Sequence, residues 1–221
     1  MKSALRSFFN SIELLAVVLF LGGVRSSQAQ NLLADPGFES GVFSPNSWSA
    51  VNAAAFSHDY SHGGVWSLKD AYDSNGIGPV VGGTQVVPGF PGLTYSLSAW
   101  ALIPAALNGG QGLLLIDFQD SNHQLINYNG AVFYTVGALT TSPTQTWNFL
   151  SGSVTAVPGT AYVQVIAELF NLGSPSPNNV VYFDDVSLTQ VPEPAGLALI
   201  CLGVGAFAHG LRRRELLRKG G

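Results

Sequence analysis

Polar and apolar residues alternate over short stretches in the middle of the chain, between residues 31 and 190. Residues 94–100 read TYSLSAW, with an apolar side chain at every second position, and Pro91-Gly92 precedes them as a turn signal. Further short apolar stretches, bounded by Gly and Pro, predict strands at 113–118, 146–154, 161–169 and 180–188. No segment here has the period of an amphipathic helix. The pattern therefore predicts an all-β domain.

The alternation breaks within the last of these strands. Val181 and Phe183 have one parity, whereas Val186 and Leu188 have the other. A continuous strand would point one of these two pairs outward, so the pattern predicts a β-bulge near Asp184 and Asp185.

The two ends of the chain differ from this middle segment. Residues 1–29 have a positive start with Lys2 and Arg6, an apolar run at 12–24, and the small residues Ser27 and Ala29 around Gln28. This is the pattern of a signal peptide, with cleavage expected after Ala29. It leaves residues 30–190 as the exported domain.

The C-terminal end carries three elements in order. Pro192-Glu193-Pro194 is followed by the mostly apolar residues 195–211 and then by Arg212, Arg213 and Arg214. A helix over the apolar run spans roughly 25 Å, the short end of what crosses a bilayer, and the arginines favour the cytoplasmic side.

Segment 191–214 resembles the PEP-CTERM sorting signal, with residues 215–221 as a short cytoplasmic tail. The resemblance implies processing by an exosortase near the Pro-Glu-Pro motif. We therefore expect a protein anchored in the inner membrane with its domain outside, or released to the outer surface or the extracellular matrix. An ordinary tail anchor with a chance Pro-Glu-Pro is the alternative.

The charge of the middle segment narrows the choice of partners. Residues 31–190 hold ten acidic residues and one basic residue, Lys69, which gives a formal charge of −9. Such a domain repels polyphosphate, so we expect no nucleic-acid partner. The chain has a single cysteine, Cys201, in the apolar tail, so the domain has no disulfide and no thiol-based site.

Several landmarks of the domain resemble carbohydrate-binding modules with the galactose-binding-like jelly-roll fold. The opening residues 31–41 read NLLADPGFESG, residues 62–69 read HGGVWSLK, and residues 181–188 read VYFDDVSL. Residues 85–89, 92–100 and 158–165 match the strands between them in the same order. The resemblance implies a jelly-roll β-sandwich, in which Trp48, Trp66 and Trp147 pack inside. Asp35 departs from the Asn that the family more often has.

In related modules the corner between the first and the last strand often holds a structural calcium ion. Carried over to this chain, the resemblance implies Ca²⁺ bound by Glu39, by Asp184 and by a backbone carbonyl near Lys69. Calcium prefers six to eight oxygen ligands, and a domain without disulfides gains stability from such a tie. The alternatives are two solvated carboxylates, or a carboxylate paired with Lys69.

A ligand site is predicted from strand parity. Trp100 shares one side of its strand with Thr94, Ser96 and Ser98, and it could serve as an aromatic platform for sugars. On the other strands, Asp117, Gln164 and Glu168 occupy the polar side, and together these four residues could line one concave face. An isolated Trp on a polar outer face is the alternative.

No motif of catalysis is present. The chain lacks the Gly-x-Ser-x-Gly, His-Glu-x-x-His and phosphate-loop patterns, so we expect no enzyme. The favoured hypothesis is a non-catalytic module that binds extracellular polysaccharide or biofilm matrix. A structural or adhesive matrix protein without a small-molecule site is the first alternative, and a glycoside hydrolase is the second.

Overall fold

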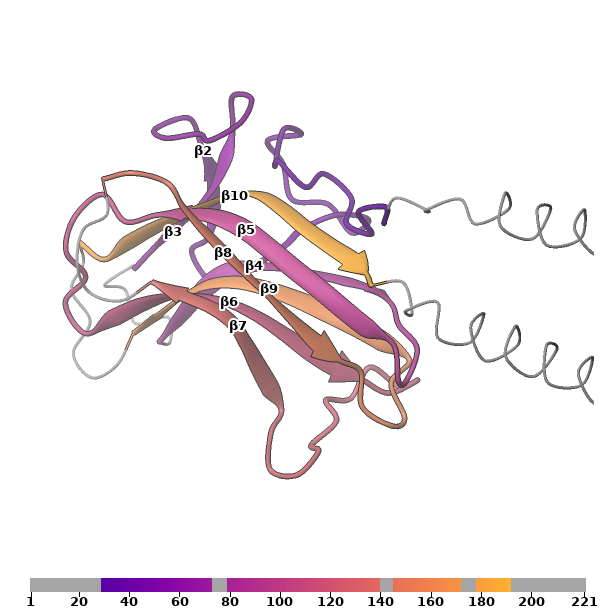
Figure 1. Cartoon of the computed structure of the whole chain (residues 1–221). Helices are drawn as coiled ribbons and strands as arrows, with labels where there is room; N and C mark the ends of the chain where they lie inside the picture. The colour runs from indigo at the N-terminus through magenta and orange to yellow at the C-terminus, as the bar shows by residue number, and fades with distance from the viewer. Residues whose placement is uncertain (1–28, 73–78, 140–144, 172–177, 192–221) are drawn as a thin grey trace, which may run out of the picture.

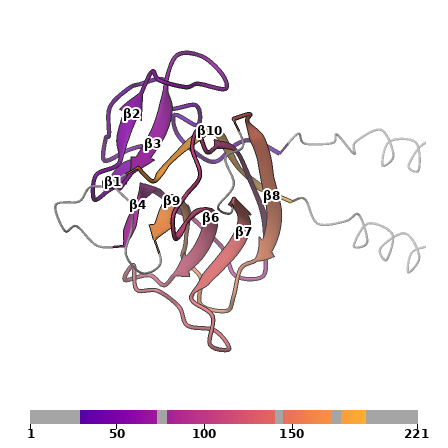
Figure 2. The same ribbon diagram turned by 90° about the vertical axis from the view of Figure 1, so that its left-hand side faces the viewer.

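The computed structural model describes residues 29–72, 79–139, 145–171 and 178–191. These residues form two antiparallel five-stranded sheets that pack face to face (Figures 1 and 2). Sheet A has the order β1 (Ser49–Val51), β4 (Val80–Pro88), β9 (Tyr162–Asn171), β6 (Gly110–Gln119) and β7 (Phe133–Leu139). Sheet B has the order β2 (Ala55–Ser57), β3 (Ser67–Ala71), β10 (Val180–Gln190), β5 (Thr94–Leu102) and β8 (Asn148–Thr155). The predicted all-β sandwich is confirmed, and no helix occurs among the described residues.

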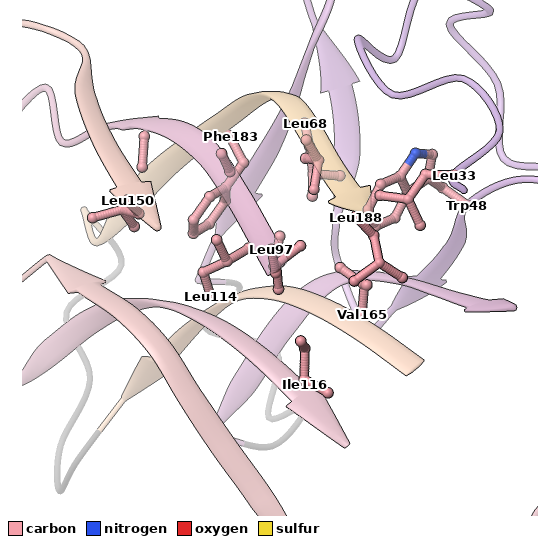
Figure 3. Close-up of a cluster of buried hydrophobic side chains, with 14 of the residues drawn as sticks. Leu33, Trp48, Leu68, Leu97, Leu114, Ile116, Leu150, Val165, Phe183 and Leu188 are labelled. Atoms are coloured by element: carbon pink, nitrogen blue, oxygen red, sulfur yellow. The ribbon is translucent and has the colours of Figure 1, made fainter. Parts of the chain in front are cut away.

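The alternating side chains of the central strands fill the space between the two sheets. Leu97 of β5 and Leu188 of β10 point inward from sheet B, and Ile116 of β6 and Val165 of β9 meet them from sheet A (Figure 3). All four are fully buried. Trp48 also belongs to this core, as predicted, and it is fully buried. The chain has one cysteine and therefore no internal disulfide. Burial of this apolar layer is the main force that stabilises the fold.

The closing strand has the predicted bulge. The pairing of β10 with β5 shifts register between Asp184 and Ser187, and Asp185 has a φ of 48°. The opening segment runs beside this strand: Leu32 N–H donates to Leu188 O at 2.8 Å, and Val186 N–H donates to Pro36 O at 2.8 Å. The bulge thus faces the start of the domain.

The strands predicted from the sequence correspond to β5, β6, β8, β9 and β10. Strand β7 is not among them, and the structure shows why its pattern is weak. None of its seven residues is fully buried, and its pairing with β6 shifts register between Leu114 and Leu115. An edge strand with an irregular register has little hydrophobic period to detect.

The expected export and sorting elements lie outside the described residues, apart from Ala29 and Val191 at the boundaries. Over the described ranges, no helix is long and apolar enough to cross a membrane.

Candidate functional site

Three of the four predicted ligand residues lie on the outer face of sheet A, the side turned away from the core. Asp117 of β6 is the cross-strand partner of Gln164 of β9, and Glu168 lies four residues further along β9. Each alternates with buried core residues such as Ile116 and Val165, so its side chain points outward. Strand parity thus put these three on one outer face, that of sheet A.

Trp100 does not join them. It lies on β5 of sheet B, where it pairs with Phe149 of β8 and with Asp184 of β10. Its side chain is on the outer face of that sheet, because Ala99 and Ala101 point into the core. The expectation of one face shared by Trp100, Asp117, Gln164 and Glu168 is wrong, since parity fixes the side of a strand but not the sheet that the strand joins.

A chain of polar and aromatic contacts extends from Asp117 across the outer face of sheet A. Nε2 of Gln119 donates to Oε1 of Gln164 at 2.6 Å and, more weakly, to Oδ1 of Asp117 at 3.4 Å. Oε1 of Gln119 lies 3.3 Å from Nδ1 of His123. The His123 ring stacks on Tyr162, with ring centroids 4.0 Å apart. Gln119 thus orients the groups around it.

The carboxyl groups on this face are poorly solvated. Asp117 is fully buried, and its Oδ2 has no hydrogen-bond partner. Burial raises the pKa of Asp117 to about 7, although the hydrogen bond from Gln119 acts in the opposite direction. Burial also raises the pKa of Glu168 to about 7. Near neutral pH each can therefore carry a proton, and the accessible hydrogen-bonding group beside Asp117 is the amide of the half-buried Gln164.

An exposed aromatic ring and a hollow flank this network. Phe133 of β7 pairs with Asp117 and is 53% exposed. On the other side, Val86 of β4 pairs with Gln164 and lines a mostly polar cavity of about 360 Å³, together with Thr84 and the 45–49 loop. The face therefore combines an aromatic surface, a hollow and hydrogen-bonding groups, which is the combination that suits a sugar chain.

Glu39 and Asp184 meet at the loop that precedes β3. The Glu39 carboxylate accepts the N–H of Val65 at 3.0 and 3.1 Å, and Oε1 also accepts the N–H of Trp66 at 3.1 Å. Oδ2 of Asp184 accepts the N–H of His62 at 2.7 Å and of Gly63 at 3.1 Å. Burial raises the pKa of Asp184 to about 6, against the lowering by these N–H groups.

The donor set at this corner does not fit calcium as it stands. Calcium binds oxygen, whereas the loop presents N–H groups, and a cation would have to displace them. Nor does Lys69 approach the two carboxylates, because its Nζ lies 2.6 Å from Oδ2 of Asp59. The described residues contain no group of three or more His, Cys, Asp and Glu side chains that could hold a metal ion. The calcium site stays a prediction.

Trp100 belongs to a compact aromatic group on sheet B. The imidazole of His62 stacks on Trp100 with centroids 4.1 Å apart, and Trp147 approaches His62 edge-on at 5.7 Å. Nδ1 of His62 lies 2.7 Å from Oδ2 of Asp185, the residue turned outward by the bulge. The expectation that Trp147 packs inside the sandwich is not met, because it contacts His62 on the outer face.

Comparison with known proteins gives structural matches only. No protein-family model matches the chain, and no curated protein does. The CBM22-1 xylan-binding domain of Xyn10C from Paenibacillus barcinonensis matches with a TM-score of 0.51 and 13% identity, over 77% of this chain and 100% of that domain. The similarity lies in the fold, a jelly-roll β-sandwich.

Two further solved structures are similar to this chain. The N-terminal CBM22-1–CBM22-2 tandem domain of the same Xyn10C matches with a TM-score of 0.50 and 14% identity, over 74% of this chain and 46% of that one. The enzymatically active domain of tailspike protein 4 from bacteriophage CBA120 gives 0.54 and 15% identity, over 73% of this chain. This chain covers only 21% of the tailspike domain. At these identities the likeness shows the jelly-roll fold alone.

Sequence reasoning missed His123, Phe133 and Tyr162 as members of this face. His123 lies in the loop after β6, and Phe133 begins an edge strand that the pattern did not reveal. Tyr162 lies in a predicted strand, but the pattern there gives no sign of a binding role. Only the pairing of β6 with both β7 and β9 brings the three together.

Proposed function

We propose that the domain binds a polysaccharide chain across the outer face of sheet A. The observation that carries the proposal is the position of the exposed Phe133 ring beside the half-buried Gln164 and the buried Asp117, on one face of a jelly-roll domain. Aromatic rings pack on the apolar faces of sugars, and amide and carboxyl groups bond to their hydroxyls. The similar xylan-binding domain supports the same class of ligand.

We propose that the bound polysaccharide is uncharged. The single basic residue between residues 31 and 190, Lys69, is paired with Asp59 and lies on sheet B. The outer face of sheet A instead carries carboxyl groups with raised pKa values. A uronate or sulfated chain would meet no counter-charge there and would be repelled by the acidic domain.

We propose binding without hydrolysis of the polysaccharide. Glycoside hydrolases hold two carboxyl groups about 5 to 9.5 Å apart. Asp117 and Glu168 are four residues apart along the paired strands β6 and β9, a separation of about 13 Å. Asp184 is fully buried beneath the 62–63 loop. This geometry supports a binding module rather than a hydrolase.

Affinity electrophoresis and calorimetry with neutral polysaccharides such as xylan and galactan test the proposal. We expect Phe133→Ala to raise Kd at least tenfold, about 1.4 kcal/mol, as for a central aromatic contact. Phe90→Ala is the matched control, because Phe90 is 61% exposed but lies in the turn between β4 and β5. Wild-type protein that binds no neutral glycan would favour the structural or adhesive matrix role. Equal Kd values for the two variants would refute the proposed face.

We also propose export and envelope anchoring, followed by exosortase processing of the tail. The support is the order of the sequence elements: residues 1–29, then the Pro192-Glu193-Pro194 motif, the apolar run and the arginines. In a host that has an exosortase, we expect the mature mass to lack the tail. Glu193→Ala should leave the tail attached, whereas an equal loss of the tail from this variant would refute the sorting role.

A further inference from the structure

The outer face of sheet B, opposite the proposed site, carries rows of small hydroxyl side chains. Three cross-strand pairs between β5 and β8 form it: Ser98 with Ser151, Ser96 with Ser153, and Thr94 with Thr155. Strand β10 extends two of these rows, since Ser187 pairs with Ser98 and Thr189 pairs with Ser96. We name these eight residues the hydroxyl face.

The groups of the hydroxyl face are available to a ligand. Ser151, Ser153 and Thr155 are exposed, and the members from β5 and β10 are half-buried. Only the pair Thr94 and Thr155 forms a side-chain hydrogen bond, at 2.9 Å. The other six hydroxyls are therefore free to bond outward, and each is both a donor and an acceptor.

An aromatic row ends the hydroxyl face. Trp100 and Phe149 form the next cross-strand pair after Ser98 and Ser151, and Phe149 is 56% exposed. Their ring centroids are 5.2 Å apart. His62 stacks on Trp100 and is bonded to Asp185, which holds the aromatic row in place. A ligand lying along the strands would meet an aromatic ring at one end and hydroxyl groups over the rest.

Size and charge indicate what kind of ligand fits. From Thr94 to Trp100 the strand advances six residues, about 20 Å, which is the length of roughly four sugar rings. None of the eight hydroxyl-face residues, nor Trp100 or Phe149, carries a charge. A polyanion finds no cation here, and a protein partner finds no apolar centre of the kind that stable interfaces bury.

We propose that the hydroxyl face and its aromatic row form a second binding surface for a neutral polysaccharide chain. The proposal rests on the function proposed for sheet A and extends it. The two surfaces lie on opposite sides of the sandwich, so one domain holds two chains at once. Such a domain cross-links polysaccharide instead of only attaching to it.

Two variants separate the surfaces. Ser151→Lys/Ser153→Lys places two long side chains on exposed positions of the edge strand β8, and Phe149→Ala removes the exposed ring. Neither changes a buried residue, so thermal melting should stay within a few degrees of wild type. Phe133→Ala removes the exposed ring from the surface on sheet A. Phe90→Ala is the control, because it removes an exposed ring that belongs to neither surface.

Calorimetry with a four-sugar oligosaccharide and light scattering with the long polymer give the test. We expect two sites per wild-type molecule and a rise in scattering with the polymer. Phe133→Ala, Phe149→Ala and the double lysine variant should each retain one site and lose the rise, whereas Phe90→Ala should behave as wild type. A single site in wild type that only Phe133→Ala removes would overturn this inference and leave the proposed function intact. No binding at all would refute both.

Sedimentation of the free protein tests whether the hydroxyl face serves self-association instead of glycan binding. We expect a monomer for wild type and for the double lysine variant. A wild-type dimer that dissociates in the double lysine variant would assign the hydroxyl face to self-association and overturn the inference.

Discussion

Gln119 and Gln164 are 45 residues apart in the sequence, yet their side-chain amides share a 2.6 Å hydrogen bond on the outer face of sheet A. Gln119 also contacts Asp117 at 3.4 Å and His123 at 3.3 Å. One buried amide therefore sets the orientation of three other polar groups. It is the centre of the site that we propose for polysaccharide.

Gln119→Ala is expected to weaken both stability and glycan binding. Its removal leaves Asp117 without a hydrogen-bond partner, which costs about 1 to 3 kcal/mol of unfolding free energy. It also releases Gln164 and His123, so Kd should rise while unfolding stays cooperative. Urea denaturation and calorimetry measure the two effects. Gln124→Ala, in the exposed loop beyond β6, is the control and should change neither.

Stability should fall as the pH rises from about 4 to about 8. Asp70 is fully buried with both carboxyl oxygens unpartnered, and burial, together with the charge of Glu168, raises its pKa well above the usual range. The pKa values of Asp117 and Glu168 are raised to about 7. Since the folded state holds these protons more tightly, their contribution is complete below the unfolded pKa, near 4, and is lost as the pH passes the folded pKa.

The size of this effect is large enough to measure. For Asp117, a shift from 3.8 to about 7 corresponds to on the order of 4 kcal/mol at full ionisation. Asp59 and Asp120 have lowered pKa values and act below pH 4, outside this window. Urea denaturation at pH 5, 6, 7 and 8 gives the profile. Asp70→Asn should flatten it and stabilise the domain at pH 8, whereas Asp120→Asn should not. A flat wild-type profile would contradict the burial of these acids.

Gly64→Ala should destabilise the domain by more than about 2 kcal/mol. Gly64 has a φ of +61°, and an added Cβ would collide with the Glu39 carboxylate. Gly92→Ala is the matched control, because Gly92 has a φ of +81° with nothing within 4 Å of an added Cβ. The control should show the backbone cost alone, about 1 to 2 kcal/mol. If denaturation gives the two variants equal stability, Glu39 does not occupy the place that the structure gives it.

A chelator should leave the melting temperature unchanged. The carboxylates of Glu39 and Asp184 already accept hydrogen bonds from five backbone N–H groups, those of residues 62, 63, 65, 66 and 185. Differential scanning calorimetry with EDTA and with added Ca²⁺ makes the comparison. A fall of several degrees with EDTA, reversed by Ca²⁺, would establish the calcium site that the sequence resemblance implies and would require the loop to turn carbonyl groups inward.

Local features of the fold were readable from the sequence. The period-two pattern of residues 94–100 and the turn signal before it produced β5, because a strand with one buried face must alternate. The break in parity between Phe183 and Val186 produced the bulge at Asp185, because both pairs of apolar residues have to reach the core. The meeting of Glu39 and Asp184 followed from the resemblance rather than from any local pattern.

Strand pairing decided the rest. Parity placed Trp100 and Asp117 each on the outer side of its own strand, but hydrogen-bonded neighbours put β5 in sheet B and β6 in sheet A, on opposite sides of the core. Asp70 shares its parity with Leu68 and is sealed inside the sandwich, although a charged residue there breaks the usual rule. The sequence by itself determined where β5, β6, β8, β9 and β10 lie and which side of each is apolar, since those depend on near neighbours. Only the tertiary structure decided which polar side chains meet, because that depends on contacts between residues far apart in the chain.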